Sequence, residues 1–170
     1  MNDFSFAGIF LLRVDIMNAI EKYYSNYNEE KRLTHKNHLP EYLVTMKYIE
    51  KYLFPGVKIA EIGSGTGRYS IALAEKGYDV TAVELVDHNL NILKSKCKTH
   101  HNIKIYKGNA VDLSFLESAA YDLVLLLGPM YHLFTSEDKR RALSEAIRIS
   151  KKGGTLRLFP LDTLKCKLIK

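Results

Sequence analysis

The sequence predicts a single α/β domain whose doubly wound, mainly parallel sheet has about five strands and helices on both faces. Three observations support this prediction. Short apolar runs alternate with helical patterns over residues 57–159, and strands that alternate with helices form β-α-β units in a parallel sheet. The run YDLVLLLG at 121–128 is apolar almost throughout, as in a strand covered on both faces. The 170 residues, 46% of them hydrophobic, suffice for one domain with a substantial core.

Two helices are predicted before the first strand, because apolar residues recur there at helical spacing. The first pattern comprises Ile9, Leu12, Ile16, Ile20, Tyr23 and Tyr27, and the second comprises Leu39, Tyr42, Leu43, Met46, Ile49 and Leu53. The triplet FPG at 54–56 ends this part of the chain, since proline and glycine interrupt regular structure.

Five strands and three helices are predicted after this point. The strands are VKIAEI, DVTAVEL, NIKIYKG, YDLVLLLG and GTLRLF. RYSIALAEKG is a helix that ends at Gly77, and HNLNILKSKCK is the next helix. The last helix spans roughly 136–151, begins with a capping box formed by Thr135 and Asp138, and ends at Gly153-Gly154. Its expected buried residues are Ala142, Leu143, Ala146 and Ile147.

The glycine-rich turn GSGTG after the first predicted strand is the best candidate for a ligand site. Strand, glycine-rich turn and helix, in this order, place a nucleotide at the carboxyl end of a sheet. Gly63 and Gly65 permit a tight turn and close approach of a ligand, and Gly67 lets the following helix pack near the strand. A dinucleotide fingerprint requires a glycine where Arg68 stands, so the spacing disfavours NAD and FAD.

Two acids flank this turn and indicate what it binds. Glu61 lies two residues before Gly63 and would repel a phosphate, so a positively charged group is expected there. Glu84 ends the second strand, about 20 residues after the turn, where a carboxylate can accept hydrogen bonds from both ribose hydroxyls. A nucleoside that carries an ammonium and a sulfonium fits both acids, and S-adenosyl-L-methionine is such a molecule.

The motifs EIGSGTGRYS, VEL, KGNAVDL and YDLVLLLG, in this order, resemble those of the class I S-adenosylmethionine-dependent methyltransferases. The resemblance covers roughly residues 57–156 and implies a Rossmann-like core. It also implies that Glu61 and the glycine loop lie against the methionine portion of the cofactor, with Glu61 reaching the amine mainly through water or backbone. The loop residues concerned are Gly63, Ser64, Gly65, Thr66 and Gly67.

The resemblance assigns the adenosine portion to two other segments. Glu84 would take the ribose hydroxyls, and Leu85 would flank the adenine. Asn109 stands where the family usually has an acid that accepts a hydrogen bond from the adenine amino group. Its amide oxygen can still accept, with a bond weaker by about 1 kcal/mol, and the Ala110 N–H can serve a ring nitrogen.

The resemblance places the methyl acceptor beside the end of the fourth strand, in LLLGPMYHLF. This stretch has neither the Asn/Asp-Pro-Pro-aromatic motif of enzymes that methylate base amino groups nor a Pro-Cys nucleophile, which argues against nucleic acid as the partner. His132 and Tyr131 are the candidate catalytic residues here, with His132 as a general base. A histidine that hydrogen-bonds nearby backbone would explain His132 without catalysis.

In this family the segment before the core often folds over the cofactor. Residues 1–56 are therefore predicted to form an N-terminal helical lid, residues 57–159 the cofactor-binding core and residues 160–170 an irregular tail. The stretch YYSNYNEEKRLTH supplies Tyr24, Arg32 and His35 as candidates that face the acceptor, and Tyr24 joins the candidate catalytic residues.

The C-terminal stretch GGTLRLFPLDTLKCKLIK departs from the family, whose sheet continues through two more strands. Arg157 also interrupts a strand expected to be buried on both faces, where an unpaired charge is costly. Either the chain is a shortened form of a longer enzyme, or the fifth strand is a free sheet edge. An exposed edge invites pairing with a second chain, so a homodimer through that edge is expected in the second case.

Composition narrows the class of protein further. The two cysteines, Cys97 and Cys166, have no paired spacing, which argues against a disulfide framework and favours a cytoplasmic protein. No apolar run approaches the span of a bilayer. His35 and His38 lie three residues apart without an evident third ligand, so no metal site is predicted. A net charge of +6 is modest for a protein dedicated to nucleic acid.

The leading hypothesis is S-adenosylmethionine-dependent methyl transfer to a small molecule, with the acceptor atom undecided. Two alternatives stay open. The basic surface is compatible with an RNA or protein methyltransferase. The altered C-terminus and Asn109 are compatible with a non-catalytic S-adenosylmethionine-binding or assembly protein.

Overall fold

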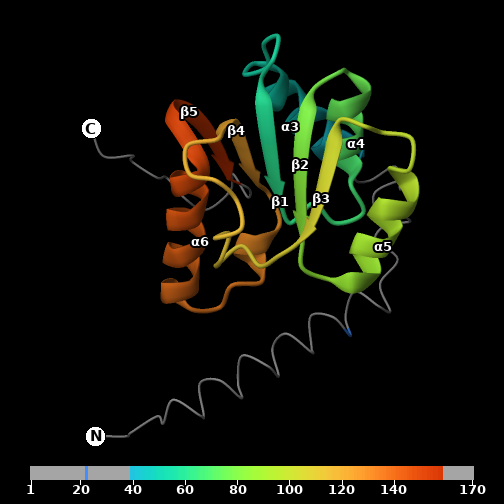
Figure 1. The fold of residues 1–170 in the computed structure, drawn as a ribbon. Helices are drawn as coiled ribbons and strands as arrows, with labels where there is room; N and C mark the ends of the chain where they lie inside the picture. Colours follow the sequence, from blue (N-terminus) through green and yellow to red (C-terminus); the bar gives the residue numbers. More distant parts are fainter. Residues whose placement is uncertain (1–21, 23–38, 159–170) are drawn as a thin grey trace, which may run out of the picture.

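The computed structural model describes residue 22 and residues 39–158 (Figure 1). The helices and strands of the continuous part are α3 (Leu39–Glu50), β1 (Lys58–Ile62), α4 (Arg68–Glu75), β2 (Asp79–Glu84), α5 (Asp87–Lys96), β3 (Ile103–Lys107), β4 (Tyr121–Leu126), the 3-10 helix η2 (Pro129–Tyr131), α6 (Ser136–Ile149) and β5 (Ser150–Leu158). The predicted lid candidates Tyr24, Arg32 and His35 lie outside the described residues.

The five strands form one sheet in the order β3-β2-β1-β4-β5, and every neighbouring pair is parallel. The prediction of a doubly wound parallel sheet is therefore confirmed. All strands end at the same edge, the lower edge in Figure 1, and the reversal of strand order between β1 and β4 is where α/β sheets bind ligands.

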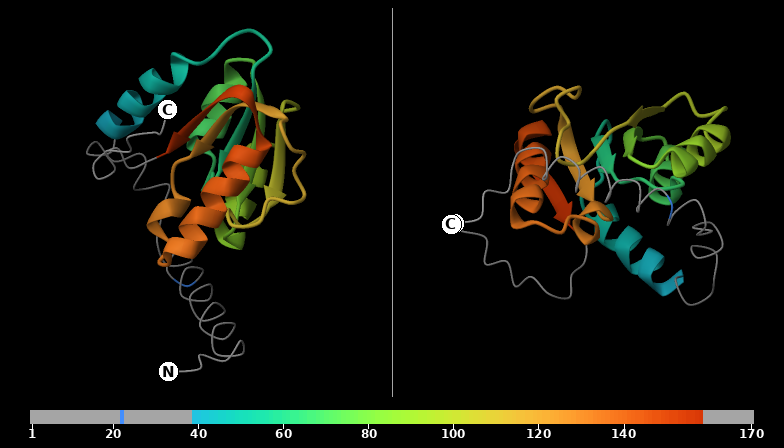
Figure 2. Two further views of the ribbon diagram at one scale, coloured as in Figure 1. Left: turned by 90° about the vertical axis from the view of Figure 1, so that its left-hand side faces the viewer. Right: turned by 90° about the horizontal axis from the view of Figure 1, so that it is seen from below.

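Helices cover the sheet on both faces, as the two views of Figure 2 show. One face packs against α3 and α4, with Met46, Ile49 and Leu73 buried against Ile59 and Leu125. Beyond them, α5 buries Leu93 against Ala82 of the same face. The opposite face packs against α6. The side chains that form this second layer of core are Ala60, Ile62, Val83, Val124, Leu126, Ala142, Ala146 and Ile149.

The connection between β3 and β4, residues 108–120, contains no helix. It runs across the face of the sheet toward α6 (Figure 1), and it buries Leu113 and Leu116 in the same core as α6. A loop therefore fills part of the layer that a crossover helix occupies in a regular β-α-β unit.

The structure corrects the end of the last helix. The cap at its start is confirmed, because the Thr135 hydroxyl accepts a hydrogen bond from the Asp138 N–H at 3.0 Å. However, α6 ends at Ile149 rather than near 151, and β5 begins at the next residue. Ile147, predicted to be buried, is 58% exposed, and Ile149 takes the buried position.

Gly153-Gly154 lies inside β5 and does not end the helix. Tyr121 pairs with Ser150 and Leu123 pairs with Thr155, so the register shifts between these two pairs. Gly153 has a φ of 80°, a conformation that suits an irregular strand residue as well as a helix cap. Because the same backbone preference of glycine serves both structures, the sequence pattern alone does not distinguish them.

Arg157 does not carry an unpaired charge into the core. Its guanidinium lies over the Tyr52 ring, 3.8 Å from the ring centroid, and a cation in this position is attracted by the face of the ring. β5 is at the edge of the sheet in the described part of the chain, so Arg157 is only partly buried. Burial nevertheless lowers the pKa of the guanidinium.

Candidate functional site

The glycine turn lies directly after β1, at the carboxyl edge of the sheet. Gly63 and Ser64 both donate a backbone hydrogen bond to the carbonyl of Val83 on β2, at 2.8 and 3.0 Å. A Cβ on Gly63 would come within 2.6 Å of the Pro129 ring, whereas a Cβ on Gly65 would meet no atom within 4 Å apart from its own chain neighbours. Gly65, whose φ is 57°, is therefore the position where a ligand can approach the backbone.

Gly67 has a packing role that involves a different neighbour from the one predicted. A Cβ there would lie 2.2 Å from Leu93 of α5, so this glycine lets α5 approach the start of α4. The close neighbour is thus another helix rather than the strand. Ser64 and Thr66 are buried between these glycines.

Glu84 is held by backbone groups on both of its oxygens. Its Oε2 accepts a hydrogen bond from the Gly65 N–H at 2.7 Å, and its Oε1 accepts one from the Val86 N–H at 2.8 Å. The residue is 5% exposed. Burial raises the pKa of this carboxyl, while the hydrogen bonds from Val86, Gly65 and Asn89 oppose the shift. With a further bond from the Leu85 N–H, these donors use about as many acceptor positions as a carboxylate has, so ligand hydroxyls would share or replace some of them.

Glu61 is the most buried acid of the site. Its carboxylate accepts a hydrogen bond from the Ser70 hydroxyl on α4, and only 2% of the residue is exposed. Burial raises the pKa of Glu61 to about 8, against the opposing hydrogen bonds from Ser70. A buried carboxyl of this kind favours a cationic partner, because a nearby positive charge would stabilise its ionised form.

The predicted adenine segment begins beside Glu84. The Gly108 N–H donates to the backbone carbonyl of Glu84 at 3.0 Å, which brings Asn109 and Ala110 to the same edge of the sheet. The Asn109 side-chain oxygen accepts a hydrogen bond from the Val111 N–H at 3.2 Å. One lone pair of that oxygen is thus used within the turn.

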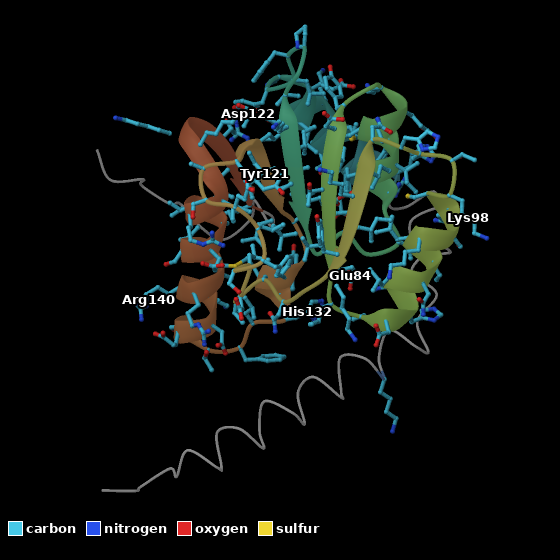
Figure 3. The ribbon with its side chains drawn as sticks, in the orientation of Figure 1. Glu84, Lys98, Tyr121, Asp122, His132 and Arg140 are labelled. Carbon is cyan, nitrogen blue, oxygen red and sulfur yellow. The ribbon has the colours of Figure 1, made fainter. Side chains whose placement is uncertain are left out.

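The end of β4 continues into η2 and completes this edge. The His132 N–H donates to the Pro129 carbonyl at 2.9 Å, so the backbone of His132 closes the short helix. Figure 3 shows His132 and Glu84 at the same lower edge of the sheet. Tyr131 and Phe134 are 56% and 71% exposed, while Tyr24 lies outside the described residues.

Two polar residues of this site, Ser70 and Asn89, have no counterpart in the predictions from sequence. Ser70 pairs with Glu61, and Asn89 supports Glu84. Thr66 has a buried hydroxyl, and Asn89 a buried side-chain oxygen, without a hydrogen-bond partner among the described residues. Ser70 falls on the first turn of the helix that follows the glycine loop, which is a signal that sequence reasoning could have used.

These residues fit the predicted cofactor. An open approach at Gly65 and a carboxylate acceptor at Glu84 suit a nucleoside. The two buried acids beside the turn, Glu61 and Glu84, suit a cation better than a phosphate. The described residues contain no group of three or more His, Cys, Asp or Glu side chains that could hold a metal ion. None of the described helices is long and apolar enough to cross a membrane.

Fold and site together define a nucleoside-binding protein of the Rossmann-like class. Comparison with known families is more specific: residues 59–154 match the profile of the methyltransferase domain. The chain belongs to this family. The resemblance to class I S-adenosylmethionine-dependent methyltransferases is thus confirmed, and the family identifies S-adenosyl-L-methionine as the cofactor.

The individual relatives share between 20% and 31% of their residues with this chain in the aligned regions. The chain is 30% identical to a demethylmenaquinone methyltransferase of Renibacterium salmoninarum over 60% of its own length and 40% of that protein. It is 31% identical to a glycine/sarcosine N-methyltransferase of Parasynechococcus marenigrum, over 58% and 36% of the two lengths. Phosphoethanolamine N-methyltransferase 1 of Haemonchus contortus, solved with phosphoethanolamine and S-adenosylhomocysteine, has a TM-score of 0.69 at 20% identity, covering 85% of this chain and 31% of that one. The chain therefore spans less than half of the length of these curated relatives.

Proposed function

We propose that this protein transfers a methyl group from S-adenosyl-L-methionine to a small-molecule acceptor. The observation that carries the proposal is the arrangement of Glu84, with both carboxylate oxygens fixed by backbone N–H groups beside the open approach at Gly65. A rigidly held acceptor for ribose hydroxyls next to an unobstructed glycine suits an adenosyl ligand better than a phosphate.

Separate parts of the chain contribute to binding. Glu84 holds the ribose, Asn109 and Ala110 the adenine, and Glu61 favours the cationic methionyl end. Bound S-adenosyl-L-methionine supplies a methyl group that is already activated by its sulfonium, so the protein needs mainly to orient the acceptor and exclude water. His132 takes the proton from an acceptor that carries one.

The acceptor site is proposed at the end of β4. The exposed rings of Tyr131 and Phe134 flank His132 in the chain, and exposed aromatic side chains beside a polar group suit an acceptor with an apolar or aromatic body. Two of the relatives are named for small acceptors, demethylmenaquinone and glycine or sarcosine, which supports a small molecule without fixing which one.

The test is a methyl-transfer assay that measures S-adenosylhomocysteine formation with a panel of phenols, quinols, small amines and an RNA fragment. The proposal expects turnover with at least one small acceptor and its loss in Glu84→Ala. Turnover with RNA alone would replace the small-molecule assignment. Binding of S-adenosylhomocysteine without any turnover would favour the non-catalytic alternative.

A further inference from the structure

Two residues of α6, Glu145 and Arg148, hold the loop that follows the predicted adenine segment. Arg148 donates to the backbone carbonyl of Leu113 at 2.7 Å, to that of Leu116 at 3.0 Å and to the Ser118 hydroxyl at 3.0 Å. Glu145 accepts a hydrogen bond from the Leu113 N–H at 2.7 Å. The pair therefore binds both backbone groups of Leu113 and two further points of the same loop.

The two side chains also hold each other. The Arg148 Nε–H donates to Glu145 Oε1 at 2.8 Å, and Nη2 donates to Oε2 at 2.9 Å, which is the two-point geometry in which arginine and a carboxylate are mutually fixed. Arg148 and Glu145 are mostly shielded, with side chains 31% and 20% exposed. Bonds made by shielded, mutually oriented ions are rigid and weakly screened by salt.

The held loop leads directly to the adenine segment. Asn109 and Asp112 form an isolated β-bridge, and the Asp112 N–H donates to the Asn109 carbonyl at 2.9 Å. Leu113 is the next residue, so a clamp on both of its backbone groups fixes the end of the turn that carries Asn109 and Ala110. The connection has no helix of its own to set this position.

We infer that Glu145 and Arg148 are positioning residues for the cofactor, which act by fixing the turn that recognises the adenine. They do not themselves contact the ligand. The inference rests on the proposed assignment of Asn109 and Ala110 to the adenine, and it adds a determinant of cofactor affinity on a helix that is remote in sequence from the ribose acid.

The same helix provides a matched control. Arg140 and Glu137 also form an ion pair with i, i+3 spacing, but their side chains are 73% and 55% exposed, and Arg140 points away from the molecule (Figure 3). Arg140→Ala and Arg148→Ala therefore remove the same charge from the same helix, and only the second releases the loop.

The experiment measures the Kd values of S-adenosylhomocysteine and S-inosylhomocysteine, which differ only at the adenine recognition edge: the inosyl ligand has a carbonyl in place of the amino group and a proton on N1. It compares the wild type with Arg148→Ala, Arg148→Lys and Arg140→Ala. We expect Arg148→Ala to weaken S-adenosylhomocysteine binding about tenfold and to reduce the preference over the inosyl ligand. Arg148→Lys should restore little, because one ammonium cannot reach Leu113, Leu116 and Ser118 together. Arg140→Ala should change neither quantity.

Amide hydrogen exchange over residues 111–116 provides a readout that does not depend on the ligand. It should become faster in Arg148→Ala and Arg148→Lys and stay unchanged in Arg140→Ala. Unchanged exchange, unchanged affinity in a folded variant, or an equal loss for both ligands would overturn the inference. A wild type that binds neither ligand would instead overturn the proposed function and leave the clamp without a cofactor to position. Loss of affinity in Arg148→Ala with none in Asn109→Ala would contradict the adenine assignment.

Discussion

The Gly65 N–H lies 2.7 Å from Glu84 Oε2, so the acid assigned to the ribose also fixes the glycine turn. Glu84 closes β2 and Gly65 lies in the turn after β1, and these neighbouring strands end at the same edge of the sheet. In the proposed complex, the ligand and the loop therefore use the same carboxylate. A change at Glu84 should act on the shape of the turn as well as on the contact with the ribose.

This dual role makes Glu84→Gln informative beside Glu84→Ala. Both oxygens of Glu84 accept from backbone N–H groups, and an amide must turn its NH₂ toward one of those donors. We therefore expect Gln to behave like Ala, with S-adenosylhomocysteine affinity reduced roughly 100-fold. Isothermal titration calorimetry measures this directly. Near-normal affinity of Glu84→Gln would show that the charge and the second oxygen are dispensable.

Glu61 should make the stability of the protein depend on pH in an unusual direction. Its pKa in the folded protein is about 8, against an ordinary value of 4.5, so the folded state binds more protons than the unfolded state between these values. The contribution of Glu61 to stability is therefore full below pH 4.5 and is lost as pH rises through 8. Urea unfolding across this window should show that the free energy of unfolding of Glu61→Gln increases relative to that of the wild type as the pH rises. A constant difference between the two would contradict the raised pKa.

Arg157 and Tyr52 should be energetically coupled. The guanidinium is partly buried over the ring, and its Nε has no hydrogen-bond partner among the described residues. A double-mutant cycle with Tyr52→Leu and Arg157→Met should give a coupling energy of about 1 to 2 kcal/mol. The exposed pair of Lys51 over Tyr48, at 4.5 Å, is the control and should give about 0.5 kcal/mol. Equal coupling energies in the two cycles would show that partial burial does not strengthen the interaction of Arg157 with Tyr52.

The edge position of β5 leads to a prediction about assembly. β4 covers one side of β5, and no strand in the described part of the chain covers the other. We expect a second chain to pair there, as exposed edges favour. Sedimentation equilibrium should then show a mass that rises toward twice the monomer with concentration. A monomer mass retained at high concentration would exclude this assembly.

The sequence could predict the parts of this structure that depend on local pattern. Strand β4 follows from its apolar run, and the proximity of Gly65 to Glu84 follows from the order of strand, turn and acid. The contacts of Arg148 could not be predicted, because Glu145 and Arg148 have the same i, i+3 spacing as Glu137 and Arg140. Only the course of the 108–120 loop distinguishes a clamp from a solvent-exposed pair.

His132 provides the sharpest test of catalysis. Its backbone N–H closes η2 by a hydrogen bond to the Pro129 carbonyl. If that structural role were its only one, the imidazole would not need to act as a base. If His132 is the general base, His132→Gln should lower kcat by about 100-fold and leave S-adenosylhomocysteine affinity unchanged. It should also abolish the acid limb of the pH–rate profile, because a general base that is protonated cannot take the proton of the acceptor. If His132 only supports the turn, His132→Gln would instead lower the thermal stability and leave the shape of the pH–rate profile intact. Retention of the acid limb in His132→Gln would therefore assign the base to another residue, or the reaction to an acceptor that needs none.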